Sequence, residues 1–159
     1  MIRLARQITG IVALVSYLLM GAMTYLTVLP GADWYWPPDF HLTGYDAQSI
    51  APFVEAISEP ARTTYGVILT RIDRIFIVAL ALWLALLGWR GGWVRYFVAG
   101  LAAIYVVIDL SENAAIYRFV FVNVMDPTAI ETAHHLTMAK FASLYLCVLV
   151  LIVHLRRSV

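Results

Sequence analysis

The chain has 159 residues, of which 62% are apolar and 13% are charged, with a formal net charge of +1 and a mean hydropathy of +0.82. Soluble domains carry about 25% charged residues, so this composition excludes an ordinary soluble domain and indicates an integral membrane protein. The sequence contains no basic tract of the kind that binds nucleic acid. Its single cysteine, Cys147, excludes a disulfide framework.

Four apolar stretches are long enough to cross a bilayer as helices, which takes about 20 residues each. They occupy about residues 8–29, 64–87, 96–122 and 129–155. We therefore predict an all-α fold, an integral membrane four-helix bundle that forms one domain over residues 1–159. The first stretch is interpreted as a retained helix, because it is too long for a signal peptide and no clear cleavage site precedes Pro30.

Residues 30–63 form the one long polar segment. Asp46 is a predicted N-cap for a short helix over residues 47–57. Its apolar residues recur at spacings of three and four, which predicts an amphipathic helix that lies on the membrane or caps the bundle. Near the fourth stretch, Thr128 and Glu131 have the spacing of a capping box.

The basic residues predict the orientation. In a four-span topology one side carries six arginines, namely Arg3, Arg6, Arg90, Arg95, Arg156 and Arg157. Basic loops stay in the cytoplasm, so both termini are predicted to be cytoplasmic and residues 30–63 to lie outside. The expected location is the bacterial inner (plasma) membrane, as a multi-pass protein.

Charged residues inside the predicted spans are the main functional signal, because such groups are costly in a bilayer. Helical rise places Asp109 roughly 20 Å above Tyr96, in the half of the membrane nearer the outer loop. The same depth is predicted for the polar residues of the neighbouring spans, and the residues expected to meet there are Asp73, Arg74, Asp109, Glu112, Asn113, His134, Thr137 and Lys140.

Tyr105, Asp109 and Glu112 share one face of the third span. Plausible ion pairs are Asp109 with Lys140 and Glu112 with Arg74. Cations and acids are expected to balance in this cluster, with Arg71, Arg74, Arg118 and Lys140 set against Asp73, Asp109 and Glu112.

Two interpretations of these residues remain open. They fix helix register as a closed ionic network, or they line a functional pocket. In the second case Asp109, Glu112 and His134 are the expected acid–base residues. The expected ligand-binding residues are Asp73, Arg74, Asn113, Thr137 and Lys140.

A metal site built from Asp109, Glu112 and His134 is disfavoured. A di-iron bundle needs a second Glu-x-x-His pair beside Glu131 and His134, and the adjacent His134 and His135 point in different directions. No metal ligand is therefore predicted, and the cofactor is left open.

Five short motifs resemble a group of small bacterial inner-membrane proteins that has no assigned activity. They are Gly44-Tyr45-Asp46-Ala47, Ala61-Arg62 with Tyr65, Asp73 with Phe76, Glu112-Asn113-Ala114, and Thr137 with Lys140. The layout of one span, a long outer segment and three closely linked spans is also similar to the sterol-isomerase and sigma-2-receptor (EXPERA) group. That resemblance implies a pocket for a lipophilic amine, with Asp73 and Glu112 as its carboxylates.

Taken together, these patterns favour a protein that binds a lipid- or isoprenoid-like small molecule in a buried polar pocket, and whether it also converts that molecule as an enzyme is left open. The alternatives are a non-catalytic accessory or assembly subunit of a membrane complex and a proton-coupled transporter. The expected partners are membrane lipid, a lipophilic small molecule, and either a membrane protein or a second copy of the chain.

Overall fold

The structure is a computed structural model that describes residues 1–90 and 92–157. Every regular element among these residues is a helix, so the predicted all-α fold is confirmed. The α-helices are α1 (Ile2–Met23), α2 (Ala47–Ala56), α3 (Glu59–Val67), α4 (Asp73–Leu87), α5 (Val94–Tyr117) and α6 (Pro127–Arg157).

Wide π-helical turns extend three of these helices. One continues α1 over Thr24–Val28, one joins α3 to α4 over Ile68–Ile72, and one continues α5 over Arg118–Val122. Because of the second turn, α3 and α4 form a continuous helix over residues 59–87. Such turns are rare in proteins and are frequently found near functional sites.

Three helical segments are long and apolar enough to cross a membrane, and they cover Ile2–Val28, Val94–Val122 and Pro127–Arg156. The helix over residues 59–87 is not among them. It carries Arg71, Asp73 and Arg74 within one turn, and each charge in a span opposes insertion. The chain therefore has the character of a membrane protein, and the crossing by residues 59–87 stays a prediction.

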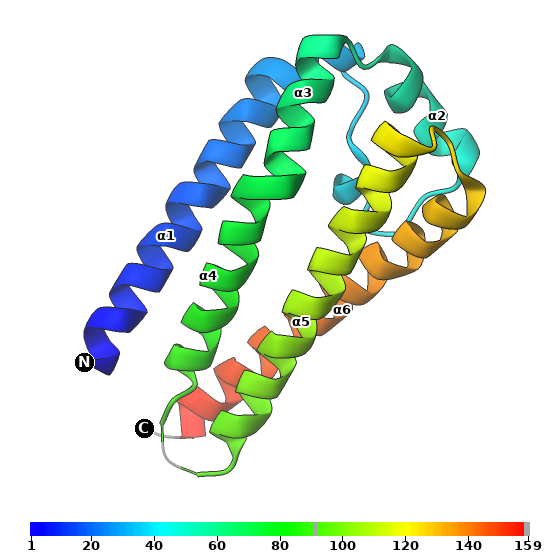
Figure 1. The fold of residues 1–159 in the computed structure, drawn as a ribbon. Coiled ribbons are helices and arrows are strands. Elements are labelled where there is room, and N and C mark those ends of the chain that lie inside the picture. The colour runs from blue at the N-terminus through cyan, green and yellow to red at the C-terminus, as the bar shows by residue number, and fades with distance from the viewer. Residues whose placement is uncertain (91, 158–159) are drawn as a thin grey trace.

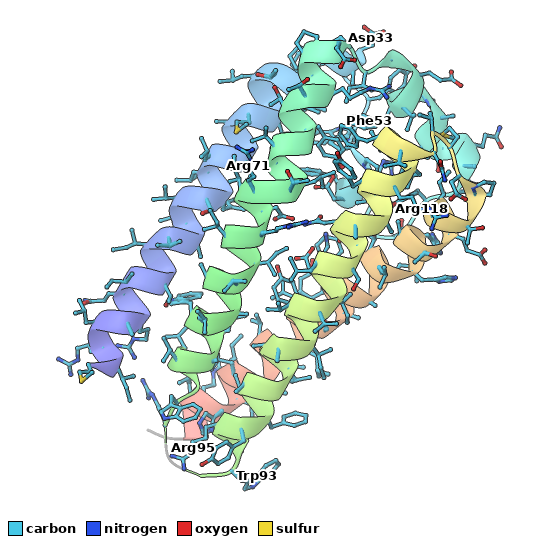
Figure 2. All side chains as sticks on the ribbon, in the orientation of Figure 1. Asp33, Phe53, Arg71, Trp93, Arg95 and Arg118 are labelled. Atoms are coloured by element: carbon cyan, nitrogen blue, oxygen red, sulfur yellow. The ribbon has the colours of Figure 1, made fainter. Side chains whose placement is uncertain are left out.

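The helices pack in an order that follows the chain. α1 packs on α4, α4 on α5, and α5 on α6 (Figure 1). The start of α1, the turn from α4 to α5 and the end of α6 lie at one end of the molecule, which we call the basic end for its residues Arg3, Arg6, Arg90, Arg95 and Arg156. The opposite end holds α2 and the start of α3, and we call it the loop end. Figure 2 shows Trp93 and Arg95 at the basic end and Asp33 at the loop end.

Two apolar clusters form the core. At the loop end, Phe53 of α2 packs with Tyr65 of α3 and Phe119 of the α5 extension. Towards the basic end, residues of α4, α5 and α6 pack together, including Ile77, Val98 and Leu151. The apolar face of α2, formed by Ile50, Phe53 and Val54, is buried within the first cluster, so α2 covers the loop end of the bundle.

Helix capping follows the sequence at one site and departs from it at another. Asp46 caps α2, since its carboxylate accepts the Ser49 N–H at 2.7 Å while the Ser49 hydroxyl accepts the Asp46 N–H at 3.0 Å. The capping box predicted from Thr128 and Glu131 is wrong. α6 begins earlier, at Pro127, and the carboxylate of Asp126 accepts the Thr128 N–H at 3.0 Å.

Candidate functional site

The polar stretch of α5 faces the interior of the bundle. Asp109 and Asn113 are each 3% exposed and Glu112 is fully buried. Spacings of three and four residues place these side chains on one face of the helix, with Tyr105 one turn before them. Ser111 points outward and returns its hydroxyl to the carbonyl of Val107 at 2.7 Å. Within residues 109–113 the helix therefore carries buried polar side chains on one face and the exposed Ser111 on the other.

Lys140 of α6 meets the two carboxylates of α5. Its Nζ lies 2.5 Å from Oε2 of Glu112 and 3.5 Å from Oδ1 of Asp109. One turn earlier, the Thr137 hydroxyl donates to Oε1 of Glu112 at 2.5 Å. The predicted pair of Asp109 with Lys140 is thus confirmed. The predicted pair of Glu112 with Arg74 is wrong, because Lys140 and Thr137 hold the two carboxylate oxygens of Glu112.

Asp73 connects α4 to the same group of residues. The Asn113 side-chain amide donates to Oδ2 of Asp73 at 2.6 Å. The carbonyl oxygen of that amide, Oδ1, is buried and has no hydrogen-bond partner among the described residues. Three helices therefore deliver polar groups to one place, as the sequence predicts, and one buried acceptor there is left open.

The structure adds Asp39 and Tyr65 to this group and includes Tyr105, which the sequence places on the same face of α5 as Asp109. Asp39, in a short 3-10 turn over Pro38–Phe40, reaches down from the loop end and accepts the Tyr65 hydroxyl at 2.8 Å. In the middle of α5, Tyr105 is buried and lies one turn before Asp109 on the same face of the helix. We call the whole set the polar layer: Asp39, Tyr65, Asp73, Tyr105, Asp109, Glu112, Asn113, Thr137 and Lys140.

Tyr105 could be predicted from the sequence, whereas Asp39 could not. Tyr105 shares the predicted inner face of α5, so its helical spacing from Asp109 is a usable signal. Asp39 has no such pattern, since the loop alone determines that it reaches Tyr65, 26 residues away. Burial raises the pKa of Asp39 above its ordinary value, against the opposing effects of the Lys140 ammonium and the Tyr65 hydroxyl.

His134 anchors the loop. Its Nδ1 accepts the backbone N–H of Tyr45 at 3.0 Å, and its ring lies edge-on to the Tyr45 ring. Gly44 adopts φ +81°, and a Cβ there would lie 2.4 Å from the His134 ring. No hydrogen bond or ion pair among the described residues joins His134 to Asp109 or Glu112, so its expected acid–base role has no contact to support it.

Arg74 lies outside the polar layer. Its side chain is exposed and lines a shallow apolar cavity between α1 and α4 with Ile8 and Val78. Arg71 is exposed as well, and Arg118 pairs at 3.0 Å with Asp126 in the turn before α6. The predicted balance of charges is therefore wrong.

The polar layer is rich in acid. It contains four carboxylates, those of Asp39, Asp73, Asp109 and Glu112, and one ammonium, that of Lys140, which is the single lysine of the sequence. Asp109 and Glu112 are buried, and Asp39 and Asp73 are half-buried. An excess of carboxylates held largely away from water is neutralised by bound protons or by a bound cationic group. The chemistry available to these groups is hydrogen bonding, charge pairing and proton transfer.

Among the described residues, no three His, Cys, Asp or Glu side chains are placed so as to hold a metal ion. The site is an acidic layer whose carboxylates are buried or half-buried, with hydroxyl and amide groups around it and with Tyr45 and Tyr65 buried on the side of the loop end. Comparison with known proteins finds no matching family model, no matching curated protein and no matching solved structure.

Proposed function

We propose that the chain is a four-span inner-membrane protein, with both termini cytoplasmic, that binds a lipid- or isoprenoid-like small molecule by its polar head in the polar layer. In this topology residues 30–58, including α2, lie outside and form an outer cover over the bundle. Proton exchange between the bound head and the carboxylates of Asp73, Asp109 or Glu112 would allow conversion as well as binding.

The observation that carries the proposal is the excess of carboxylates over cations in the polar layer. A network that only fixes helix register needs matched charges, because each unmatched buried charge is costly. Lys140 satisfies Glu112 and Asp109, which leaves Asp73 and Asp39 without an ion pair among the described residues. These two carboxylates and the open Oδ1 of Asn113 are available to a ligand.

The surroundings favour a ligand that is mostly apolar. Towards the basic end the layer is followed by the apolar packing of Ile77, Leu84 and Val98, and towards the loop end by aromatic rings such as Phe53. Apolar walls with a few convergent polar groups are typical of small-molecule sites. The apolar packing below the layer gives no support to a proton path through the bundle, so transport is the least favoured of the three functions.

The test uses a substitution that leaves the Lys140 pairs untouched. Asp73→Asn keeps the shape of the side chain and removes its charge, while Glu131→Gln removes an exposed carboxylate of α6 and serves as the matched control. The three proteins are purified in mild detergent and examined by native mass spectrometry and lipid extraction. We expect a lipophilic molecule bound by the parent and by Glu131→Gln and absent from Asp73→Asn, with an unchanged Tm.

The second candidate is an accessory subunit in which the layer only joins helices. The double pairing of Lys140 across α5 and α6 favours it, because such a pair links two helices without a ligand. This candidate predicts that all three proteins carry the same bound lipids and that a stoichiometric membrane protein co-purifies with each. That result would refute the binding function.

A further inference from the structure

An apolar groove runs along α1 on the side that faces α4. Its volume is about 810 Å³, within the roughly 300–1,000 Å³ of small-molecule pockets. Leu4, Ile11 and Leu14 form one wall, and Phe76, Leu80 and Trp83 form the other. The groove lies towards the basic end of the molecule, so it is separate from the polar layer and does not depend on the function proposed for that layer.

The contacts between the two helices set the length of this groove. Gly10 allows the closest approach, since a Cβ there would lie 2.7 Å from the indole nitrogen of Trp83. At the far end, the ring of Tyr17 lies 5.8 Å from that of Phe76. From Leu4 to Tyr17 the helix rises by roughly 20 Å, somewhat more than the ~15 Å hydrocarbon depth of one leaflet. The groove therefore matches one lipid chain that enters from the basic end.

The mouth of the groove is positively charged. Arg6 and Gln7 line it, and Arg3 lies one turn before them. No acidic residue precedes Asp33 in the sequence, and no ion pair among the described residues involves Arg6. A half-buried guanidinium without an acidic neighbour, at the end of an apolar groove, is complementary to a phosphate group that carries an acyl chain.

We infer that this groove holds one acyl chain of an acidic glycerophospholipid, whose phosphate is bound by Arg6 and Gln7. A free phosphate would not fill the apolar walls between Leu14 and Trp83, and an uncharged lipid would leave Arg6 without a counter-charge. The site selects its lipid by charge at the mouth and by chain length along the groove.

The first test compares two arginines of the same helix. The protein is reconstituted into vesicles of equal phosphatidylglycerol and phosphatidylcholine, extracted in mild detergent and examined by native mass spectrometry. We expect one retained phospholipid, with phosphatidylglycerol favoured about fivefold, the size of effect that one basic residue produces at an anionic surface. Arg6→Gln should abolish this preference, and Arg3→Gln, outside the groove, should preserve it.

The second test locates the lipid. A photo-crosslinking residue at Leu14, which lines the groove, should capture phospholipid more often than one at Leu18, which is similarly exposed but does not line it. Equal retention of the two lipids by the parent, or equal loss of preference in Arg6→Gln and Arg3→Gln, would overturn the inference. Crosslinking of Leu14 to a second protein would overturn it too, because a partner helix would then occupy the groove.

Discussion

At the level of single residues, Lys140 controls the electrostatics of the polar layer. Its ammonium lies 2.5 Å from Glu112 and 3.5 Å from Asp109, and the side chains involved are buried. In such surroundings the attraction between ions is strong, but the loss of either partner leaves a charge that neither water nor protein compensates. The stability of the layer thus depends on the presence of this cation more than on any one carboxylate.

Lys140→Met should therefore reduce the free energy of unfolding by about 3–5 kcal/mol. The double variant Lys140→Met with Glu112→Gln should recover part of this loss, because it removes a carboxylate that the single variant leaves unpaired. Chemical unfolding in detergent, followed by circular dichroism, measures both. If Lys140→Met is as stable as the parent, the carboxylates are neutral in the folded protein and the ion pairs contribute little.

Asp39 should make the free energy of unfolding depend on pH in the opposite direction to an ordinary ion-paired carboxylate. Its pKa is raised by burial in the folded protein, whereas the unfolded chain releases the proton at its ordinary pKa near 3.8. Between these two values the folded state binds more protons, so the free energy of unfolding falls as pH rises through that window.

Asp39→Asn, which cannot ionise, should accordingly have a higher Tm than the parent at pH 8, and the difference should shrink as pH approaches 4. Thermal unfolding across this range measures the difference between the two proteins, in which the other titrating groups cancel. Asp33→Asn, at an exposed position of the same loop, should show no such trend. A difference that grows towards low pH would contradict the burial of Asp39.

Helical spacing predicted most of the residues of the polar layer. It did not predict the direction of the Arg74 side chain or the position of the loop residue Asp39. It placed Asp109, Glu112, Thr137 and Lys140 at one depth on inner faces, and the structure joins them. The same depth estimate included Arg74 and was wrong, because depth along a helix does not give the direction in which a side chain points. Asp39 was missed because its position depends on the path of the whole loop.

At the level of elements, Gly44 allows the loop between α1 and α2 to approach α6 closely. Gly44 has a positive φ of +81° and leaves no room for a side chain beside His134. This approach allows Nδ1 of His134 to accept the Tyr45 N–H, which places the Tyr45 ring over the polar layer next to Thr137. The cover over the site is thus fixed by backbone geometry.

Gly44→Ala should release this cover. The left-handed backbone costs an alanine about 1–2 kcal/mol, and the new Cβ would collide with the His134 ring, so we expect a lower Tm and faster proteolysis within residues 41–46. Gly21→Ala is the matched control, because no atom lies within 4 Å of its added Cβ and alanine favours the helix. Equal behaviour of the two variants would show that the loop is not anchored at Gly44.

The predicted limits of the long helices differ from the observed ones by up to six residues, as at the start of α1, and the π-helical turns within them were not predicted. The apolar stretch 96–122 corresponds to α5 with its extension over residues 94–122. The π-helical turns have no marker in the sequence, because they arise from packing and not from residue preference. The start of α6 was misplaced because Asp126-Pro127 and Thr128 with Glu131 are both valid starting signals, and sequence does not rank them.

For the molecule as a whole, short connections favour contact between the helices that they join. The contacts of α4 with α5 and of α5 with α6 agree with this expectation, and α1 packs against α4 across the long loop (Figure 1). The first apolar stretch predicted α1, but the two grooves beside it were not predicted. The groove that contains Trp83 depends on the approach of that residue to Gly10, a contact between residues 73 positions apart that no local pattern encodes.

The predicted topology requires the helix over residues 59–87 to cross the membrane, and labelling of cysteines on its two sides tests this crossing. In a Cys147→Ala background, Gln48→Cys, Trp93→Cys and Thr128→Cys each place one thiol at an exposed position. If this helix crosses the bilayer, a membrane-impermeant maleimide added to intact bacterial cells should label Gln48→Cys and Thr128→Cys, and should label Trp93→Cys only after permeabilisation. The charges of Arg71, Asp73 and Arg74 oppose insertion, whereas the hydrogen bond between Asp73 and Asn113 and the packing of the helix on α1 and α5 favour it. Equal labelling of Gln48→Cys and Trp93→Cys in intact cells would mean that this helix does not cross, and the polar layer would then face a membrane surface.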